Sequence, residues 1–220
     1  MDVFCNEQHD LIRQTVRDFA EREIKPLAQE LDEHESFSYA LTKRMGELGL
    51  FGMTISPEFG GQGLDYLSYI IAVEEIARID GSQAATLAAH NSLGIGPLYN
   101  YGTAEQKRKY LPPLCTGDAL WGFGLTEPEA GSDSRGSRTR AEKHGEYWKI
   151  NGSKIFITNA ATAITIGSTV QAVSGTNGEF STIIVPQNTP GFSAVTMHGK
   201  MMWRGRSEER RVGKECRSRW

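Results

Sequence analysis

The residues best suited to chemistry lie in two short segments, 123–133 and 156–159. The first, FGLTEPEAGSD, follows a β-type run and gathers turn-forming and polar residues, namely Thr126, Pro128, Gly131, Ser132 and Asp133. Such a turn can present backbone N–H groups and hydroxyls to an anion. In the second segment Phe156 and Thr158 are two residues apart, so on a strand they project from one face. An aromatic ring beside a hydroxyl suits a flat heteroaromatic ligand, but spacing alone favours an ordinary turn and a Phe/Thr face packed on a core.

The remaining candidates indicate structure rather than chemistry. The five histidines and three cysteines have no metal-ligand spacing, so no metal site is predicted. His90, in an alanine-rich stretch, is interpreted as a hydrogen-bonded core residue. Glu74 and Glu75 are adjacent on a predicted helix and point about 100° apart, so at most one faces inward and an ion pair or a solvated face is expected. FGGQG (59–63) lacks the strand-then-helix context of a phosphate-binding loop.

The first half of the chain has the periodicity of helices. Apolar residues recur at helical spacing over 7–33, with a kink expected at Pro26, and over 38–48. Asp65 is a candidate N-cap for a helix over 66–79, and a further helix begins at Ser82. Thr103 and Gln106 predict a capping box for a last helix that ends before Pro112–Pro113. Residues 1–118 therefore form an expected N-terminal α-helical domain, interrupted by a glycine-rich loop.

The second half changes to short β-type segments. They are WGFGLT, SRTRAEK, EYWKING, SKIFITN, ITIGSTVQAV and FSTIIVP, with turn signals at 144–145, 151–152 and 177–178. Several short strands with such turns predict a small antiparallel barrel or sandwich over 119–205. The predicted fold class is therefore α+β multidomain, with an all-α domain followed by a β domain.

Composition excludes several classes of protein. The chain has 220 residues, 39% hydrophobic and 23% charged, with a formal net charge of −3, and has no apolar run long enough for a membrane span. Three cysteines and an acidic N-terminus without a signal sequence predict a reduced, cytoplasmic location. The basic stretch 206–220, RSEERRVGKECRSRW, resembles a translated sequencing adapter, so we interpret it as a non-native tail. No nucleic-acid or membrane partner is predicted.

Two stretches carry a resemblance to a known family. LTEPEAGSD (125–133) and KINGSKIFITNA (149–160) resemble the signature stretches of the acyl-CoA dehydrogenases. PEFGGQGLDY (57–66), HNSLGIGPLYNYGTAEQKRKYLPPL (90–114) and TPGFSAV (189–195) resemble other family segments in the expected order. The resemblance runs from about residue 5 to about residue 205.

The resemblance implies FAD as the cofactor, with its flavin ring between domains. The residues expected to bind it are Phe123, Gly124, Leu125, Thr126, Glu127, Pro128, Glu129, Ala130, Gly131, Ser132, Phe156, Ile157 and Thr158. Leu125 and Thr126 would contact the ring, and Ser132 would contact the pyrophosphate and lie where acyl-CoA binds. Phe156 would pack against the isoalloxazine, and Thr158 would hydrogen-bond flavin N5.

The resemblance also implies the reaction and the partners. The family removes the α-proton of an acyl-CoA thioester and transfers the β-hydrogen as hydride to flavin N5, and an electron-transferring flavoprotein takes the electrons. The full-length parent is expected to be a homotetramer whose C-terminal four-helix bundle carries the glutamate base. That bundle has no counterpart in these residues, so no catalytic residue is assigned and the chain alone is expected to be inactive. The alternatives are a non-catalytic binding module, or an acyl-CoA oxidase or flavin monooxygenase of the same superfamily.

Overall fold

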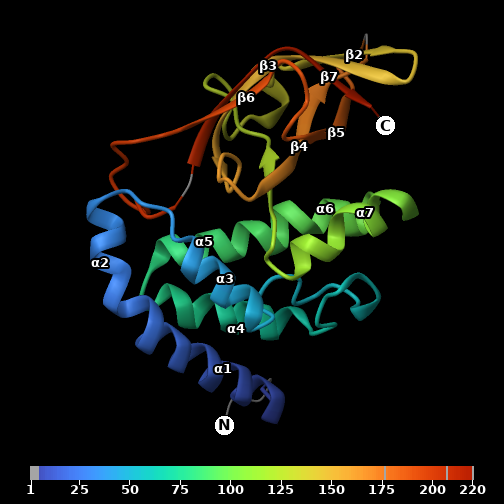
Figure 1. Ribbon diagram of the computed structural model, residues 1–220. Helices are drawn as coiled ribbons and strands as arrows, with labels where there is room; N and C mark the ends of the chain where they lie inside the picture. Colours follow the sequence, from blue (N-terminus) through green and yellow to red (C-terminus); the bar gives the residue numbers. More distant parts are fainter. Residues whose placement is uncertain (1–4, 176, 207, 220) are drawn as a thin grey trace. The chain divides into compact units, whose positions relative to one another are not determined.

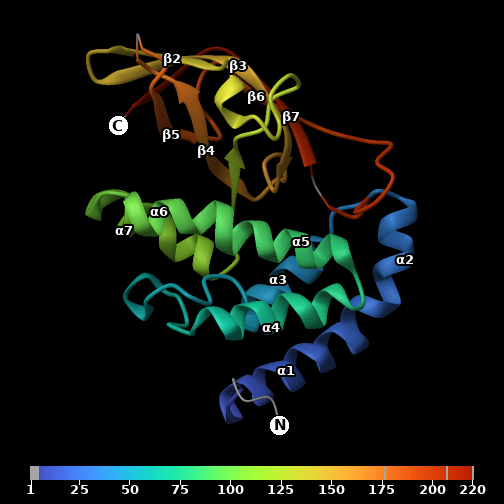
Figure 2. The same cartoon turned by 180° about the vertical axis from the view of Figure 1, so that it is seen from behind.

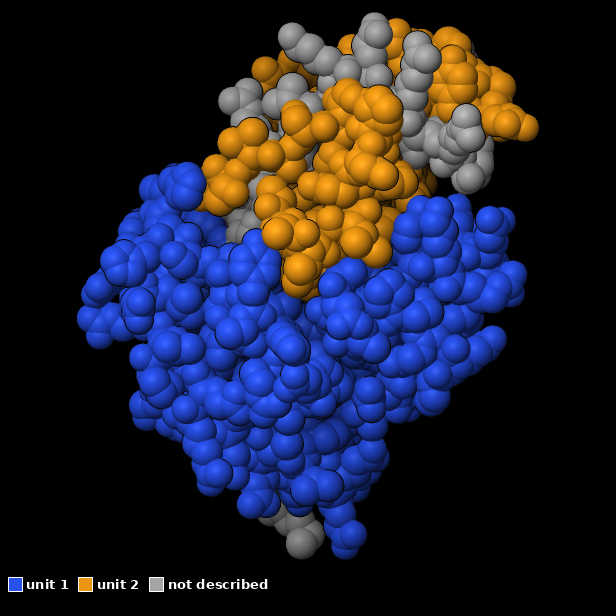
Figure 3. Space-filling model, viewed as in Figure 1, with its two compact units in different colours: residues 1–119, 198–206 blue, residues 120–197, 207–220 orange. Residues whose placement is uncertain are grey.

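A computed structural model of the chain describes residues 5–175, 177–206 and 208–219, the last stretch by its backbone alone. The chain divides into two compact units, residues 1–119 with 198–206 and residues 120–197 with 207–220 (Figure 3). The first unit is helical and the second is built on a sheet (Figure 1). Among the residues described, no helix is long and apolar enough to cross a membrane.

The helical unit begins with a long helix that changes its winding before Pro26. It consists of α1 (Glu7–Phe19), a π-helical turn η1 (Ala20–Ile24) and α2 (Lys25–Glu33). Because the helix continues from Ile24 into α2, Pro26 is an interior position that lacks a hydrogen-bond donor, and the irregular turn directly precedes it. The kink predicted at Pro26 thus corresponds to a π-helical turn that ends two residues earlier, at Ile24.

The other helices of this unit follow the sequence prediction closely. They are α3 (Tyr39–Glu47), a 3₁₀ turn η2 (Pro57–Phe59), α4 (Tyr66–Ala77), α5 (Gly81–Ala89), a π-helical turn η3 (His90–Ile95), α6 (Gly96–Tyr101) and α7 (Ala104–Cys115). Asp65 caps α4, since its carboxylate accepts the backbone N–H of Ser68 at 2.7 Å. Helix α4 packs between α1 and α5 (Figure 2).

The predicted end of α7, before Pro112–Pro113, was wrong. The capping box of Thr103 and Gln106 is present, but the helix continues through Pro112 and Pro113 to Cys115. Prolines lack the N–H of a helical hydrogen bond, yet here they lie in the last turns, and Thr116 still donates to the Pro112 carbonyl at 3.2 Å. Leu111 and Leu114 are fully buried, so packing keeps these residues helical.

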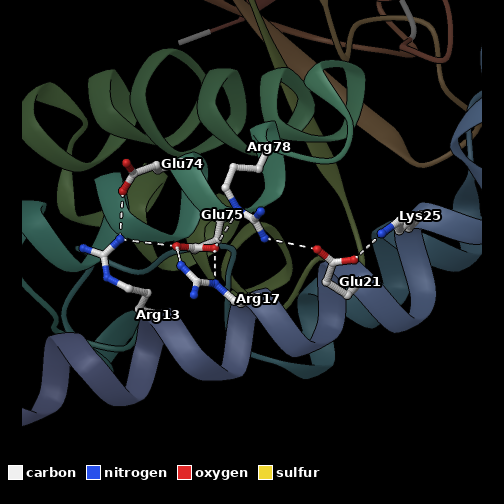
Figure 4. A network of polar contacts seen from close by, with 7 residues as sticks. All are labelled: Arg13, Arg17, Glu21, Lys25, Glu74, Glu75 and Arg78. Carbon is white, nitrogen blue, oxygen red and sulfur yellow. Dashed lines mark hydrogen bonds and ion pairs between the residues drawn. The ribbon is translucent and has the colours of Figure 1, made fainter.

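An ion-pair network joins α1 to α4 (Figure 4). Glu75 is buried, with 2% of its side chain exposed, and its two oxygens accept from Nε and Nη2 of Arg17 at 2.9 and 2.8 Å. Arg13 and Arg78 also donate to the Glu75 carboxylate, at 3.3 and 3.2 Å, whereas Glu74 is exposed and pairs with Arg13 at 3.0 Å. The structure thus confirms that one of the two adjacent carboxylates faces inward and forms ion pairs.

Residues 198–206 belong to the helical unit, although the sequence boundaries placed 198–205 in the β domain. The contacts that hold this segment centre on Glu35, which follows the C-cap of α2. Its carboxylate accepts the backbone N–H of Gly199 at 2.9 and 3.0 Å and pairs with Arg204 at 3.1 Å. Glu35 lies outside every predicted helix, and nothing in its local sequence indicates this contact.

The second unit is one mixed sheet. Its strands are β1 (Leu120–Gly124), β2 (Arg140–His144), β3 (Tyr147–Thr158), β4 (Thr165–Val173), β5 (Phe180–Pro186), β6 (Phe192–Thr196) and β7 (Glu208–Arg219). The order is β1-β4-β2-β3-β7-β6, with β5 on β4. The expected architecture was an antiparallel barrel or sandwich. Because β1–β4 and β2–β4 are parallel and the described strands form a path that does not close, it is corrected to a mixed sheet that is not a closed barrel.

Two of the three predicted turns are confirmed. Gly145 lies in the β2–β3 hairpin and Gly178 lies between β4 and β5, both at positive φ. Asn151–Gly152 is not a turn but an irregularity inside the continuous strand β3, where the pairing with β7 shifts register. A Cβ at Gly152 would lie 2.3 Å from Oγ1 of Thr139, so close approach of the neighbouring loop, rather than chain reversal, explains this glycine.

The stretch interpreted as a non-native tail contains β7, which pairs with β3 and β6. The core of this unit is a cluster of small and branched side chains from four strands. Its members are Ala141, Ile150, Val170, Ala172, Ile183 and Val185.

Candidate functional site

The first chemistry-bearing segment is the loop between β1 and β2. It begins at Leu125 and contains a tight turn, in which Glu127 and Ala130 exchange backbone hydrogen bonds of 2.9 and 3.2 Å. Leu125 and Thr126 are half-buried, and Glu127 and Ala130 are buried. The exposed residues of the turn are Pro128, Glu129, Gly131 and Ser132. The loop therefore exposes the polar side chains of Glu129 and Ser132 and is anchored by the buried Glu127 and Ala130.

Phe123 and Gly124 precede this loop on β1, half-buried and buried respectively. A Cβ at Gly124 would lie 3.3 Å from the Lys154 side chain and 3.4 Å from Val170. Since that spacing is tighter than ordinary van der Waals contact, the glycine lets β1 approach β3 and β4 closely.

The second segment is the end of β3, and its backbone is unusual. Phe156 has a φ of +60°, a left-handed conformation that is a genuine outlier for a bulky residue. The pairing of β3 with β7 shifts register between Lys154 and Ile157. As a result Lys154 and Ile157 are both buried, whereas Phe156 is 55% exposed and Thr158 is half-buried. The bulge thus turns the Phe156 ring outward.

The structure brings the two segments together. The backbone N–H of Ile155 donates to the carbonyl of Thr126 at 2.9 Å. The ammonium of Lys154 donates to the carbonyl of Leu125, also at 2.9 Å. The loop after β1 and the end of β3 are therefore in direct contact, which places the expected ring-contacting residues of one segment near those of the other.

A buried ion pair lies at this junction. Lys154 Nζ is 2.7 Å from Oε1 of Glu127, and the two side chains are 3% and 5% exposed. Burial would raise the pKa of Glu127, but hydrogen bonds from Lys154, Ser137 and the backbone of Arg138 outweigh it and lower that pKa to about 2. Burial lowers the pKa of Lys154, and the hydrogen bond to Glu127 opposes that change. Glu127 is therefore ionised at neutral pH.

Sequence reasoning missed Lys154 and Ser137. Period-two alternation puts Lys154 on the same face as Phe156, and a lysine is seldom buried, so the sequence does not indicate a buried Lys154. The bulge separates the two side chains, leaving Lys154 buried and Phe156 exposed, and no local signal in SKIFITN marks a bulge.

Other sequence candidates lie in the helical unit. His90 is fully buried, and its Nε2 is 2.9 Å from the carbonyl of Leu114. Burial lowers its pKa to about 4, so the predicted hydrogen-bonded core histidine is confirmed. Within the described part of the chain, no group of three or more His, Cys, Asp or Glu side chains could hold a metal ion.

Two family models match the chain. The N-terminal domain of acyl-CoA dehydrogenases matches residues 6–118, and the middle domain matches residues 122–214. The second match extends into the stretch interpreted as a tail.

Individual proteins agree with these matches. A probable acyl-CoA dehydrogenase of Bacillus subtilis is 44% identical over 209 residues, covering 93% of this chain and 54% of its own length. A short-chain specific acyl-CoA dehydrogenase of Clostridium acetobutylicum is 44% identical over 203 residues, covering 91% and 53%. The structure of a glutaryl-CoA dehydrogenase from Mycobacterium smegmatis in complex with FADH2 has a TM-score of 0.94 at 33% identity and covers 100% of this chain and 55% of its own.

The chain thus spans about half the length of the curated relatives it matches. Both family models match in the order that the sequence motifs predict, and the fold agrees over the whole chain. This chain belongs to the acyl-CoA dehydrogenase family.

Proposed function

We propose that this chain is the flavin-binding part of an FAD-dependent dehydrogenase that acts on short-chain acyl-CoA thioesters. One observation carries the proposal: the loop after β1 and the end of β3 are hydrogen-bonded to each other, through Thr126 to Ile155 and through Leu125 to Lys154. The residues that the family resemblance assigns to the flavin come from these two segments.

The side chains present suit such a cofactor. The exposed ring of Phe156 provides an apolar surface for a flat ring system, and the half-buried hydroxyls of Thr126 and Thr158 provide donors for its polar edge. The exposed turn at Gly131 and Ser132 has room for a phosphate, because a Cβ at Gly131 would have no atom within 4 Å. The donors and the aromatic surface therefore fit FAD.

Each residue has a distinct proposed role. Phe156 stacks on the ring, and the Thr158 hydroxyl donates to the edge at which negative charge develops during reduction, where a fixed donor is most effective in a site shielded from water. Leu125 and Thr126 line the ring, and Ser132 binds the pyrophosphate beside the acyl-CoA. When bound, FAD supplies the hydride acceptor for α,β-dehydrogenation of the thioester.

The substrate class and partners rest on the family. The Clostridium relative is named as short-chain specific, which favours a short acyl group here. We propose an electron-transferring flavoprotein as the electron acceptor and a homotetramer for the full-length protein. The resemblance assigns the general base to none of these residues, so binding of FAD, rather than turnover, is the test of this chain.

Titration of the purified chain with FAD tests the proposal. We expect saturable binding, followed by a change in the visible absorption of the flavin, and weaker binding in Phe156→Ala and Thr158→Ala. Two controls match these changes: Tyr101→Ala removes a ring that is 89% exposed in the helical unit, and Thr196→Ala removes an exposed hydroxyl of β6. Absence of saturable binding at millimolar FAD would refute the proposal, as would equal affinity in all four variants.

A further inference from the structure

Lys154 has no assigned role so far, and Glu127, which the resemblance places among the cofactor-binding residues, is buried against it. All three N–H groups of the Lys154 ammonium are hydrogen-bonded: they donate to Leu125, Glu127 and Ser137 at 2.9, 2.7 and 3.0 Å. A lysine ammonium has three donors, so this geometry uses all of them.

Both oxygens of the Glu127 carboxylate are also hydrogen-bonded. It accepts the Ser137 hydroxyl at 2.5 Å and the backbone N–H groups of Arg138 and Thr139 at 2.6 and 3.0 Å. Glu127 therefore joins the start of the loop to its end, and Lys154 ties both ends to β3.

The pair also adjoins a strained backbone. Phe156 keeps a left-handed φ of +60°, and such a conformation persists only where its surroundings determine it from both sides. On one side Lys154 and Ile155 are bonded to the loop, and on the other Ile157 is buried, with 2% exposed. The pair thus fixes the residue that precedes the bulge.

Stability is a weak explanation for such a pair. Replacing a buried ion pair by well-packed apolar residues is often neutral or stabilising, because two charges lose their hydration. An apolar pair would lack directional hydrogen bonds, and hydrophobic contact alone does not fix the distance between the loop and the strand.

We propose that Lys154 and Glu127 are positioning residues for the cofactor: they hold the loop that carries Leu125 and Thr126 at a fixed distance from the strand that carries Phe156 and Thr158. This inference rests on the proposed function, because it assigns a purpose to the spacing only if a ring lies against both segments. A displacement of about 1 Å in such a site weakens the function markedly.

The test is the double variant Lys154→Met with Glu127→Gln. The glutamine oxygen can still accept from Ser137 and Thr139, although the acceptor for the Arg138 N–H is lost, and methionine fills the volume of the lysine stem without its charge. We expect at least a tenfold weaker Kd for FAD and, at saturating FAD, an altered visible circular dichroism of the bound flavin. A merely structural role would leave the spectrum of the saturated, folded protein unchanged.

A matched control is Lys149→Met, the same substitution on the same strand, for which parental affinity and spectrum are expected. If the double variant fails to fold by far-ultraviolet circular dichroism, Ser137→Ala replaces it. That change removes the hydroxyl that bridges the pair and should weaken FAD binding about threefold. Parental Kd and spectrum in the folded variant would overturn the positioning role while leaving the proposed function intact, whereas failure of the parent to bind FAD would overturn both.

Discussion

Replacing Glu75 by glutamine tests how strongly α1 is held to α4. The carboxylate is 2% exposed and receives donors from Arg13, Arg17 and Arg78 (Figure 4). The hydrogen bonds from Arg17 lower the pKa of Glu75 to about 2, although burial opposes the change. Glutamine retains the shape and one acceptor oxygen but removes the charge.

The expected loss follows from the exposure of the partners. Breaking a fully buried ion pair costs about 3–5 kcal/mol, because the remaining charge has no water. Here the arginine side chains are 30%, 50% and 44% exposed, so each guanidinium recovers hydration when the carboxylate charge is removed. We therefore expect Glu75→Gln to lower the free energy of unfolding by about 2 kcal/mol, and the Tm of a unit of this size by about 8 °C.

Urea unfolding, followed by far-ultraviolet circular dichroism, measures this loss in the helical unit. Glu74→Gln is the matched control, because it makes the same chemical change at the next residue, whose side chain is 59% exposed. We expect its effect to stay below about 0.5 kcal/mol. If the two variants unfold within that margin of each other, the buried network does not hold α1 to α4 and the reasoning is wrong.

Three further predictions concern the helical unit. Burial lowers the pKa of His90 to about 4, so between pH 6.5 and 4 the unfolded state binds a proton that the folded state does not. The free energy of unfolding should therefore fall as the pH is lowered through this range. In a pH series, His90→Gln should reduce that loss. Gly61→Ala places a Cβ 2.1 Å from the Ile55 carbonyl and should cost about 1–3 kcal/mol in urea, whereas Gly96→Ala, whose nearest atom is 3.7 Å away, should cost nothing. Burial raises the pKa of Cys115 to about 12, so a thiol reagent should modify this residue only in urea; rapid labelling of Cys115 in the native chain, distinguished from the half-buried Cys5 by peptide mass spectrometry, would contradict this.

The helical unit was largely predictable because its signals are local. Asp65 and Thr103 cap helices at the residues where the sequence places caps, since a cap depends on a side chain and a backbone N–H three residues away. The continuation of α7 through Pro112 was not predictable, because it depends on the burial of leucines against other helices.

The candidate site was predictable only in part. Spacing alone favoured a Phe156/Thr158 face packed on a core, but Phe156 is 55% exposed. The turn at 127–130 does follow from residue types. The bulge at Phe156 and the burial of Lys154 do not, because each depends on pairing with a strand distant in the sequence. Side chains of β3 alternate between its two faces, but the bulge adds a residue, so the side chains after it lie on the opposite faces from those that alternation predicts.

The path of the sheet explains why the site depends on distant pairing. In strand order β1 and β3 are separated by β4 and β2, yet the loop that follows β1 is hydrogen-bonded to β3. The link between β4 and β2 is a single pair, Arg140 with Val173. A sheet held by one pair at this point can fold on itself, and the core cluster supports this, since it joins Ala141 and Ile150 of β2 and β3 to residues of β4 and β5.

The folding of the sheet at the β4–β2 junction also brings together residues of the site. Because β1 comes to lie against β3, the close approach at Gly124 and the buried pair of Lys154 and Glu127 arise at the same place. A larger residue at Gly124 would push β1 away from the Lys154 stem, and the carbonyl of Leu125 would lose its donor. The close approach at Gly124 and the buried ion pair therefore arise where β1 meets β3, whereas the outward Phe156 ring follows from the bulge in the pairing of β3 with β7, and no pattern within either signature segment specifies these contacts.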